Sequence, residues 1–118
     1  MYTTFSEVKH ALSAGKSVVD IVNHYLLQIA ANKELNAFIE VYEAEALERA
    51  AAIDQKRANG TAGRLAGMVI GLKDNICYAN HKVSASSKIL AGFESLYSAT
   101  VVERLLSEDA LIIGRLNC

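Results

Sequence analysis

A chain of 118 residues has the length of one domain and can bury roughly two-thirds of the surface that its unfolded form exposes. Its hydrophobic fraction of 52%, with 21% charged residues, favours an ordered globular protein over a disordered one. Twelve basic and thirteen acidic residues leave a net charge of -1, which excludes a global field that would attract nucleic acid or anionic lipid.

The N-terminus and the cysteines bear on where the protein works. Residues 1–17 lack the basic start, the apolar core and the cleavage site of a signal peptide, and no stretch reaches the roughly 18 apolar residues that suggest a membrane span. We therefore expect a cytoplasmic protein that does not contact a membrane. Cys77 and Cys118 are too few for a disulfide framework and lack the neighbours of a zinc site, so we expect two free thiols.

The first part of the chain predicts two helices. Residues 6–14 predict a short helix that Gly15 closes. Ser17 stands three residues before Asp20, which resembles a capping box at the start of a second helix reaching about Asn32. The apolar stripe of this second helix consists of Val18, Ile21, Val22, Tyr25 and Ile29.

A possible strand and a long helix follow. Residues 36–41, "NAFIEV", are compact, apolar and partly β-branched, so they could form a short strand or an extended link. Residues 42–59 predict a long helix that Gly60 ends, and Glu45 stands four residues before Arg49, the spacing of an ion pair on a helix. The apolar stripe of this helix consists of Ala46, Leu47, Ala50 and Ile53.

The sequence changes character after residue 60. We therefore divide the chain into a helical N-terminal region, 1–60, and the start of an α/β core, 61–118. The core begins with a loop, 60–67, that has three glycines in eight residues. The runs 68–72 and 110–114 are short and apolar, as in strands that are covered on both faces.

Between these two runs the sequence predicts helix. Residues 87–92 favour a short helix, and residues 99–109 carry a helical apolar stripe. Strand, helix and parallel strand with a right-handed crossover is the simplest arrangement. Two strands cannot form a sheet that covers both of its faces, so either the chain pairs with more strands or it is incomplete.

Several motifs of known chemistry are missing. The glycines at 60, 63, 67 and 71 form neither of the usual phosphate-binding patterns, and the GxSxG motif of serine hydrolases does not occur. His10, His24 and His81 are scattered without the spacing of metal ligands, and we expect them at the surface or at an interface. The sequence therefore supports neither a nucleotide site nor a metal site.

Lys73 is the candidate catalytic residue, and its position in the sequence can be interpreted in two ways. In the first, the strand ends at Leu72, Lys73 and Asp74 reach water, and Asp-Asn begins a turn. In the second, Lys73 lies at the C-terminal end of a central strand, where α/β proteins place their ligand sites. Burial there would penalise the charged form of the lysine and let it act as a general base near neutral pH.

The stretches "GRLAGMVIGLKDNIC", "VSASSKIL", "SATVVERL" and "ALIIGRLNC" resemble the N-terminal part of the amidase signature family, and the likeness extends back through "LNAFIEVYEAEALERAAAID". Within the family, the likeness is strongest to the glutaminase subunits of tRNA-dependent amidotransferases. Four residues of the chain depart from the family pattern. Val69 stands where proline is usual, Ser98 where aspartate is common, and Glu108-Asp109 where Ala-Gly is more usual.

The resemblance implies a fold and a catalytic residue. It implies a helical N-terminal part followed by the first strand-helix-strand units of the family's mixed α/β sheet. The family hydrolyses amides with a triad of Ser, a Ser preceded by a cis peptide, and Lys, and Lys73 matches the triad lysine. Both serines belong to a segment beyond Cys118, whereas Ser84 to Ser87 match a turn to which we assign a structural role. By resemblance the chain is an N-terminal fragment, inactive by itself.

The resemblance also implies a reaction and partners. Glutamine would be the substrate, and the ammonia released would convert Glu-tRNA(Gln) to Gln-tRNA(Gln) together with B and C subunits. ATP and Mg would serve the whole complex, with no cofactor in this chain, and tRNA would bind through the complex. Two alternatives stay open: another amidase of the same family, or a short non-catalytic protein that binds partners through its apolar faces.

Overall fold

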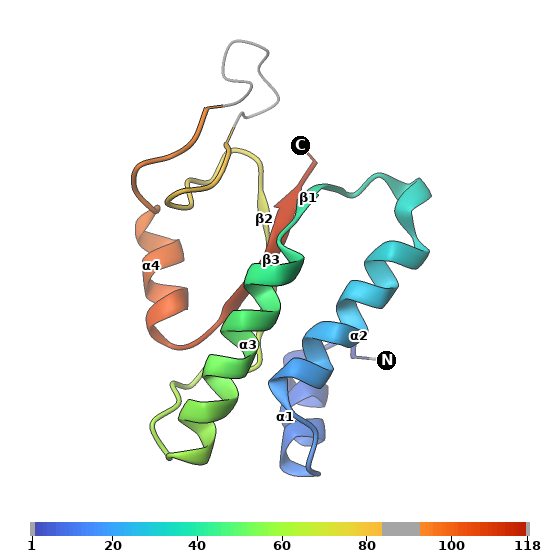
Figure 1. The fold of residues 1–118 in the computed structure, drawn as a ribbon, viewed down its shortest axis with the longest axis vertical. Coiled ribbons are helices and arrows are strands. Elements are labelled where there is room, and N and C mark those ends of the chain that lie inside the picture. The colour runs from blue at the N-terminus through green and yellow to red at the C-terminus, as the bar shows by residue number, and fades with distance from the viewer. Residues whose placement is uncertain (1, 84–92, 118) are drawn as a thin grey trace.

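A computed structural model describes residues 2–83 and 93–117 as a mixed α/β fold around a three-stranded sheet (Figure 1). The strands are β1 (Phe38–Val41), β2 (Val69–Lys73) and β3 (Leu111–Leu116), in the order β1-β3-β2. The helices are α1 (Phe5–Ser13), α2 (Val18–Ala31), α3 (Glu43–Ala58) and α4 (Thr100–Ser107), with a 3-10 turn η1 (Lys33–Leu35) after α2. The expected α/β class is confirmed.

The first two helices begin with side-chain caps. The Thr4 hydroxyl accepts from the Glu7 amide at the start of α1, and Gly15 follows this helix with a φ of 108°. At the start of α2, the Ser17 hydroxyl accepts from the Asp20 amide, and the Asp20 carboxylate accepts from the Ser17 amide. The capping box that the sequence predicts is therefore present, and it satisfies two amides that the helix cannot.

The helix over residues 42–59 is confirmed as α3, but its charged residues have other partners than their spacing predicts. Arg49 donates from Nε and Nη2 to the Ala110 carbonyl and from Nη2 to the Leu106 carbonyl. Glu45 accepts from the ring of His81 at 2.7 Å. Tertiary contacts thus take up both side chains, because carbonyls at the end of α4 offer Arg49 buried acceptors that Glu45 on the helix surface does not.

The sheet confirms one expectation and settles an alternative. β2 and β3 are parallel and joined through α4, as the sequence predicts. The segment 36–41, left open between strand and link, contains β1, which pairs antiparallel with β3. This third strand makes β3 the central strand of the sheet.

β3 is buried on both faces. Leu111 and Ile113 belong to one apolar cluster, which they form with α1, α2 and α3, and Ile112 belongs to a second cluster with Leu72 of β2 and Val102 of α4. Figure 1 shows α4 on one side of the sheet and α1 and α2 on the other. Gly114 lies opposite β1, and a Cβ there would stand 2.5 Å from the Glu40 carbonyl oxygen, so only glycine fits this pairing.

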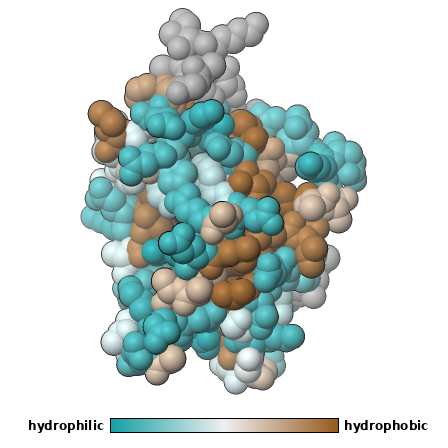
Figure 2. Space-filling model, in the orientation of Figure 1, coloured by the Kyte–Doolittle hydropathy of each residue, from teal (hydrophilic) through white to brown (hydrophobic). Residues whose placement is uncertain are grey.

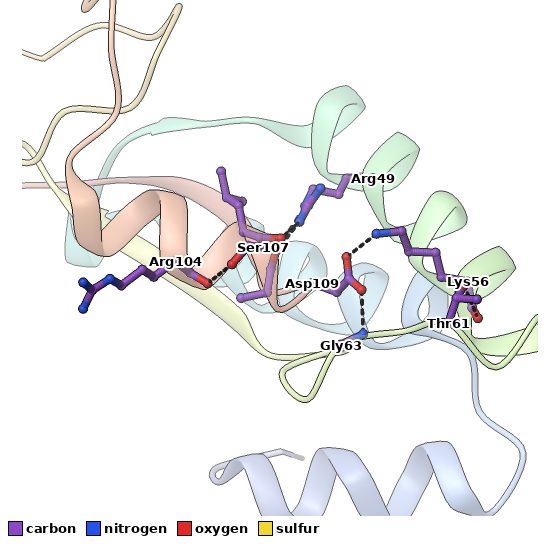
Figure 3. A network of polar contacts seen from close by, with 9 residues as sticks. Arg49, Lys56, Thr61, Gly63, Arg104, Ser107 and Asp109 are labelled. Atoms are coloured by element: carbon purple, nitrogen blue, oxygen red, sulfur yellow. Dashed lines mark hydrogen bonds and ion pairs between the residues drawn. The ribbon is translucent and has the colours of Figure 1, made fainter.

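A polar network holds the glycine-rich loop against the start of β3 (Figure 3). The Asp109 carboxylate accepts from Lys56 Nζ at 2.8 Å and from the Gly63 amide at 2.7 Å. Gly63 approaches Glu108 so closely that an added Cβ would lie 2.6 Å from the Glu108 backbone. Asp109 has a φ of 69°, a conformation that favours glycine and that aspartate tolerates. This explains how Asp109 can stand where the family more usually has a glycine.

Some sequence-based predictions lie outside the described residues. These are the short helix at 87–92, the role of Ser84 to Ser87, and the thiol of Cys118.

Cys77 is a free cysteine, as expected. The division at residue 60 stays a prediction, and β1 from the first region pairs with β3 from the second. In the described part of the chain, no helix combines the length and apolar character needed to cross a membrane.

We predict that Asp109→Asn lowers the free energy of unfolding by about 1–3 kcal/mol at neutral pH, since two donors lose a charged acceptor. Asparagine tolerates the positive φ, so the backbone adds little to this loss. Burial acts to raise the pKa of Asp109, but the hydrogen bonds from Lys56 and the Gly63 amide outweigh it and hold the pKa below its ordinary value. The advantage of the wild type is therefore complete above the unfolded pKa of about 3.9 and lost as the pH falls through the lower folded pKa.

Urea unfolding of both proteins between about pH 7 and about pH 2 checks this. Arg64→Gln is the control, because the Arg64 side chain is 90% exposed and its ion pair with Glu108 should contribute little. An equal loss for Asp109→Asn across this pH range would contradict the role given to the carboxylate.

Candidate functional site

The candidate site is the C-terminal end of the parallel pair β2-β3, where Lys73 is the last residue of β2. Ligand sites of α/β proteins lie at this end of their strands. Lys73 thus stands at the C-terminal end of a parallel strand, as the second interpretation requires, but β2 is an edge strand of the described sheet and not the central strand that this interpretation expects.

The burial of this site differs from both interpretations. Leu72 is 6% exposed and Asp74 is fully buried, whereas Lys73 between them is exposed. The expectation that Asp74 reaches water is wrong. The expectation that Lys73 is desolvated is also not met within the described fold, since Lys73 is exposed and its ammonium group makes no hydrogen bond or ion pair with the described residues. The physical reason is the alternation of side chains along a strand: Leu72 is buried, and Lys73 after it points to the opposite face of the sheet.

The backbone around Lys73 is held on both sides. Lys73 stands opposite Leu116 in the parallel pairing, and its carbonyl accepts from the Ile76 amide at 3.0 Å, which begins a turn. A Cβ at Gly71 would lie 3.1 Å from the Leu116 side chain, so Leu116 packs closely over β2 two residues before the lysine. The starting point of the Lys73 side chain is therefore well defined although its ammonium group is not paired within the described part of the chain.

A buried guanidinium joins the ends of the three strands. Arg115 of β3 is 8% exposed, and its Nη1 lies 2.5 Å from Asp74 Oδ1. Its Nη2 lies 3.5 Å from Oε1 of Glu40, a residue of β1. Since an isolated buried charge is costly, each of the two buried groups is stabilised by the other.

Sequence reasoning missed this pairing. Arg115 and Asp74 are 41 residues apart, and although each lies in a stretch that resembles the family, no pattern in the sequence links the two. The available signal was an arginine at the end of the apolar run "ALIIGRL", in a segment that otherwise predicts a buried strand. A charge in such a strand requires a buried partner of opposite sign, but the sequence does not say which carboxylate supplies it.

His81 lies in an aromatic cluster rather than simply at the surface. Its ring stacks on Tyr78 with the centroids 3.9 Å apart and lies 4.6 Å from the ring of Tyr42. Its Nδ1 and Nε2 each lie 2.7 Å from an oxygen, of Ala79 and of Glu45 respectively. His10 is exposed, as expected, and His24 is partly buried between Tyr2 and Tyr25.

The loop after β2 is tied to the start of α4. The Ser98 hydroxyl accepts from the Ala79 amide at 2.9 Å, so serine supplies an oxygen acceptor where the family commonly has aspartate. Val69 is the first residue of β2, a position in a strand where the usual proline would also be accommodated. No cluster of three His, Cys, Asp or Glu side chains that could hold a metal ion is found among residues 2–83 and 93–117.

Known proteins match this chain over most of its length. The family described as Amidase matches residues 20–118. A glutamyl-tRNA(Gln) amidotransferase subunit of Salinibacter ruber is 43% identical over 119 aligned residues, which cover 99% of this chain. The corresponding protein of Clostridium acetobutylicum is 47% identical over 100 residues, or 83% of this chain.

Among solved structures, the peptide amidase from Stenotrophomonas maltophilia superposes with a TM-score of 0.88 at 34% identity, over 98% of this chain and 24% of its own. The match to the two amidotransferase subunits covers 23% and 21% of their lengths. The chain thus spans about a quarter of the proteins that it resembles.

We predict that Tyr42 stays protonated at a pH where exposed tyrosines ionise. Burial raises the pKa of Tyr42 to about 12, with the charge of Glu40 adding to the effect and Arg115 opposing it. The stability that the neutral phenol contributes is complete below the unfolded pKa of about 10 and is lost as the pH rises through the folded pKa.

Burial also raises the pKa of Tyr25 and of Tyr78, so absorbance titration of tyrosinate should show a late step whose amplitude Tyr42→Phe lowers by one tyrosine. Tyr97→Phe is the matched control, because the Tyr97 ring is 67% exposed and its loss should leave the late step in place. A late step of the same amplitude in Tyr42→Phe as in the wild type would contradict the burial of Tyr42.

Proposed function

Because the chain belongs to the amidase family, we propose that it is the N-terminal part of an amide hydrolase in which Lys73 is the triad base. The observation that carries this proposal is the position of Lys73 at the C-terminal end of a parallel strand, next to buried Leu72 and Asp74. Its ammonium group makes no ion pair with the described residues and so is available to another part of the protein.

The proposed chemistry needs two serines that the family supplies from sequence beyond Cys118. A neutral Lys73 would accept a proton relayed through the bridging serine from the nucleophilic serine, which would then attack the carboxamide carbon. The lysine would later help to return a proton to the departing ammonia. The residues that cover Lys73 would have to come from the same downstream region, because a lysine left in water stays charged. The 118 residues by themselves would therefore be inactive.

We further propose that the parent protein is a glutaminase subunit of the tRNA-dependent amidotransferase type. The identity of 43% over 99% of the chain to the Salinibacter ruber protein supports this choice. Glutamine would supply ammonia for the conversion of Glu-tRNA(Gln) to Gln-tRNA(Gln), with B and C subunits as partners, in the cytoplasm. ATP, Mg and tRNA would be bound by the complex and not by this chain.

Another amidase of the same family is an alternative parent. The peptide amidase from Stenotrophomonas maltophilia shares the fold of this segment at 34% identity. The fold of the first quarter does not distinguish the two, since the described residues around Lys73 form the end of a sheet and no enclosed acyl pocket.

A non-catalytic role in partner binding is the second candidate function, and exposed apolar residues favour it. Leu96 is 90% exposed, Leu27 73% and Leu35 69%. A groove of about 470 Å³ lies between the end of α2 and β1 and reaches Val69 and Gly71 of β2. Figure 2 shows apolar residues gathered in the centre and on the right of the visible face. A partner protein or the rest of a larger amidase could cover this surface.

We predict that Lys73→Ala in the full-length parent, assembled with its partner subunits, lowers kcat for glutamine hydrolysis by about three orders of magnitude or more. Ammonia release in single-substrate assays measures this. Lys82→Ala is the matched control, because Lys82 is also exposed and follows the same strand but lies outside the triad motif. Full activity of Lys73→Ala would rule out the triad assignment.

The mass of the native protein separates the two classes of function. An antibody raised against residues 1–118 should detect a product several times heavier than 12.8 kDa in the source cells. A product of only 12.8 kDa would instead favour the non-catalytic protein, since the serines would then have to come from another chain.

A further inference from the structure

The pair formed by Asp74 and Arg115 lies directly beside the candidate base, because Asp74 is the next residue after Lys73. The Asp74 carboxylate is fully buried and Arg115 is 8% exposed, so the two charges meet away from water. A buried ion pair with a short contact defines the geometry of both partners more strictly than a surface pair does. Arg115 therefore contributes to fixing the position of Asp74.

Arg115 is itself held by the sheet. It lies in the central strand β3, opposite Leu72 of β2 in the parallel pairing and opposite Glu40 of β1 in the antiparallel pairing. Its second nitrogen lies 3.5 Å from the Glu40 carboxylate, so one guanidinium contacts carboxylates from both sides of β3. Its planar fork suits this task, which the single ammonium group of lysine could not perform in the same geometry.

The Lys73 ammonium group makes no hydrogen bond or ion pair with the described residues, so its placement there depends on its backbone. Before Lys73 the backbone is held by the pairing of β2 with β3. After Lys73 it leaves the sheet in a turn, and there the Asp74 side chain provides the connection back to β3. A general base must lie within hydrogen-bond reach of its proton, and a displacement of about 1 Å can cost about a hundredfold in rate.

We propose that Arg115 is a positioning residue for Lys73, acting through the buried carboxylate of Asp74 and supported by Glu40. This inference rests on the proposed role of Lys73 as the base. Arg115 also offsets the negative charge of Asp74. In its absence that charge would favour the ammonium form of the neighbouring lysine, which cannot accept a proton.

The test uses Arg115→Met and Arg115→Lys in the full-length parent with its partner subunits, and it measures glutamine hydrolysis as a function of pH. We expect Arg115→Met to lower kcat about a hundredfold with little change in KM, and to move the acid limb of the kcat profile to higher pH. Arg115→Lys keeps the charge, so it should leave the acid limb in place and lower kcat by only about tenfold. A purely structural role would lower Tm and leave kcat and its pH profile unchanged for the folded fraction, which would overturn the proposal.

A second set of variants shows whether the effect passes through Asp74. Asp74→Asn should lower kcat as Arg115→Met does, and the double variant should lose no more than the worse single variant. If the two losses in kcat multiply in the double variant, Arg115 and Asp74 act independently, and the proposed action of Arg115 through Asp74 is contradicted. If Arg115→Met does not fold, Arg115→Lys decides: a lower kcat at an unchanged Tm supports the proposal, and an unchanged kcat overturns it.

Lys73→Ala in the same assay separates this inference from the function on which it rests. If Lys73→Ala is active, the proposed function fails and the positioning role fails with it. If Lys73→Ala is inactive and the Arg115 variants keep normal kinetics, only the positioning role fails.

Discussion

The burial of β3 on both faces is the constraint on which the rest of the structure depends. Residues 110–113 of this segment are at most 3% exposed. One face requires the three helices that precede the core, and the other requires α4. Since β3 also pairs with β1 on one edge and β2 on the other, the described sheet is built around this one segment.

Polar groups lie near both ends of the buried strand β3, and each needs a partner of opposite charge or a hydrogen-bond partner. Residues from distant segments of the chain provide these partners. At the start of β3, Asp109 joins Lys56 of α3 to Gly63 of the loop, while Arg49 satisfies carbonyls at the end of α4. At the other end, Arg115 lies near the carboxylates of Glu40 in β1 and of Asp74, the first residue after β2. The first group secures the loop that leads into β2, and the second secures the end of β2.

The polar networks at the two ends of β3 differ in their distance from the proposed catalytic residue. The network at Asp109 connects loop, helix and strand, and it faces no candidate chemical group. The network at Arg115 lies beside Lys73, which the sheet presents at its carboxyl end with an unpaired ammonium group in the described part of the chain. The backbone of the proposed base is thus held by the pairing of β2 with β3 and by the turn that follows, while the proposed function requires that other residues cover its side chain. An amidase needs both features, because a base must be in the right place and also lose its proton.

Residues with a local signal were predicted well. The capping box at Ser17 and the stripes of α2 and α3 depend on neighbours within one turn, and periodicity reports these directly. The location of Lys73 at a strand end followed from the apolar run before it. The segment 36–41 stayed ambiguous, because a four-residue strand acquires its identity only from the strand with which it pairs.

The sequence by itself determined the α/β class, the helix boundaries and the candidate base, because these depend on residues close together in the chain. Only the tertiary structure decided which side chains meet: His81 with Glu45, Arg49 with the carbonyls of Leu106 and Ala110, and Arg115 with Asp74. It also decided that Asp74 is buried and Lys73 is exposed, although the two are adjacent in the sequence. The physical reason is that burial and charge pairing depend on how segments up to 61 residues apart pack together. A local sequence pattern carries no information about this packing.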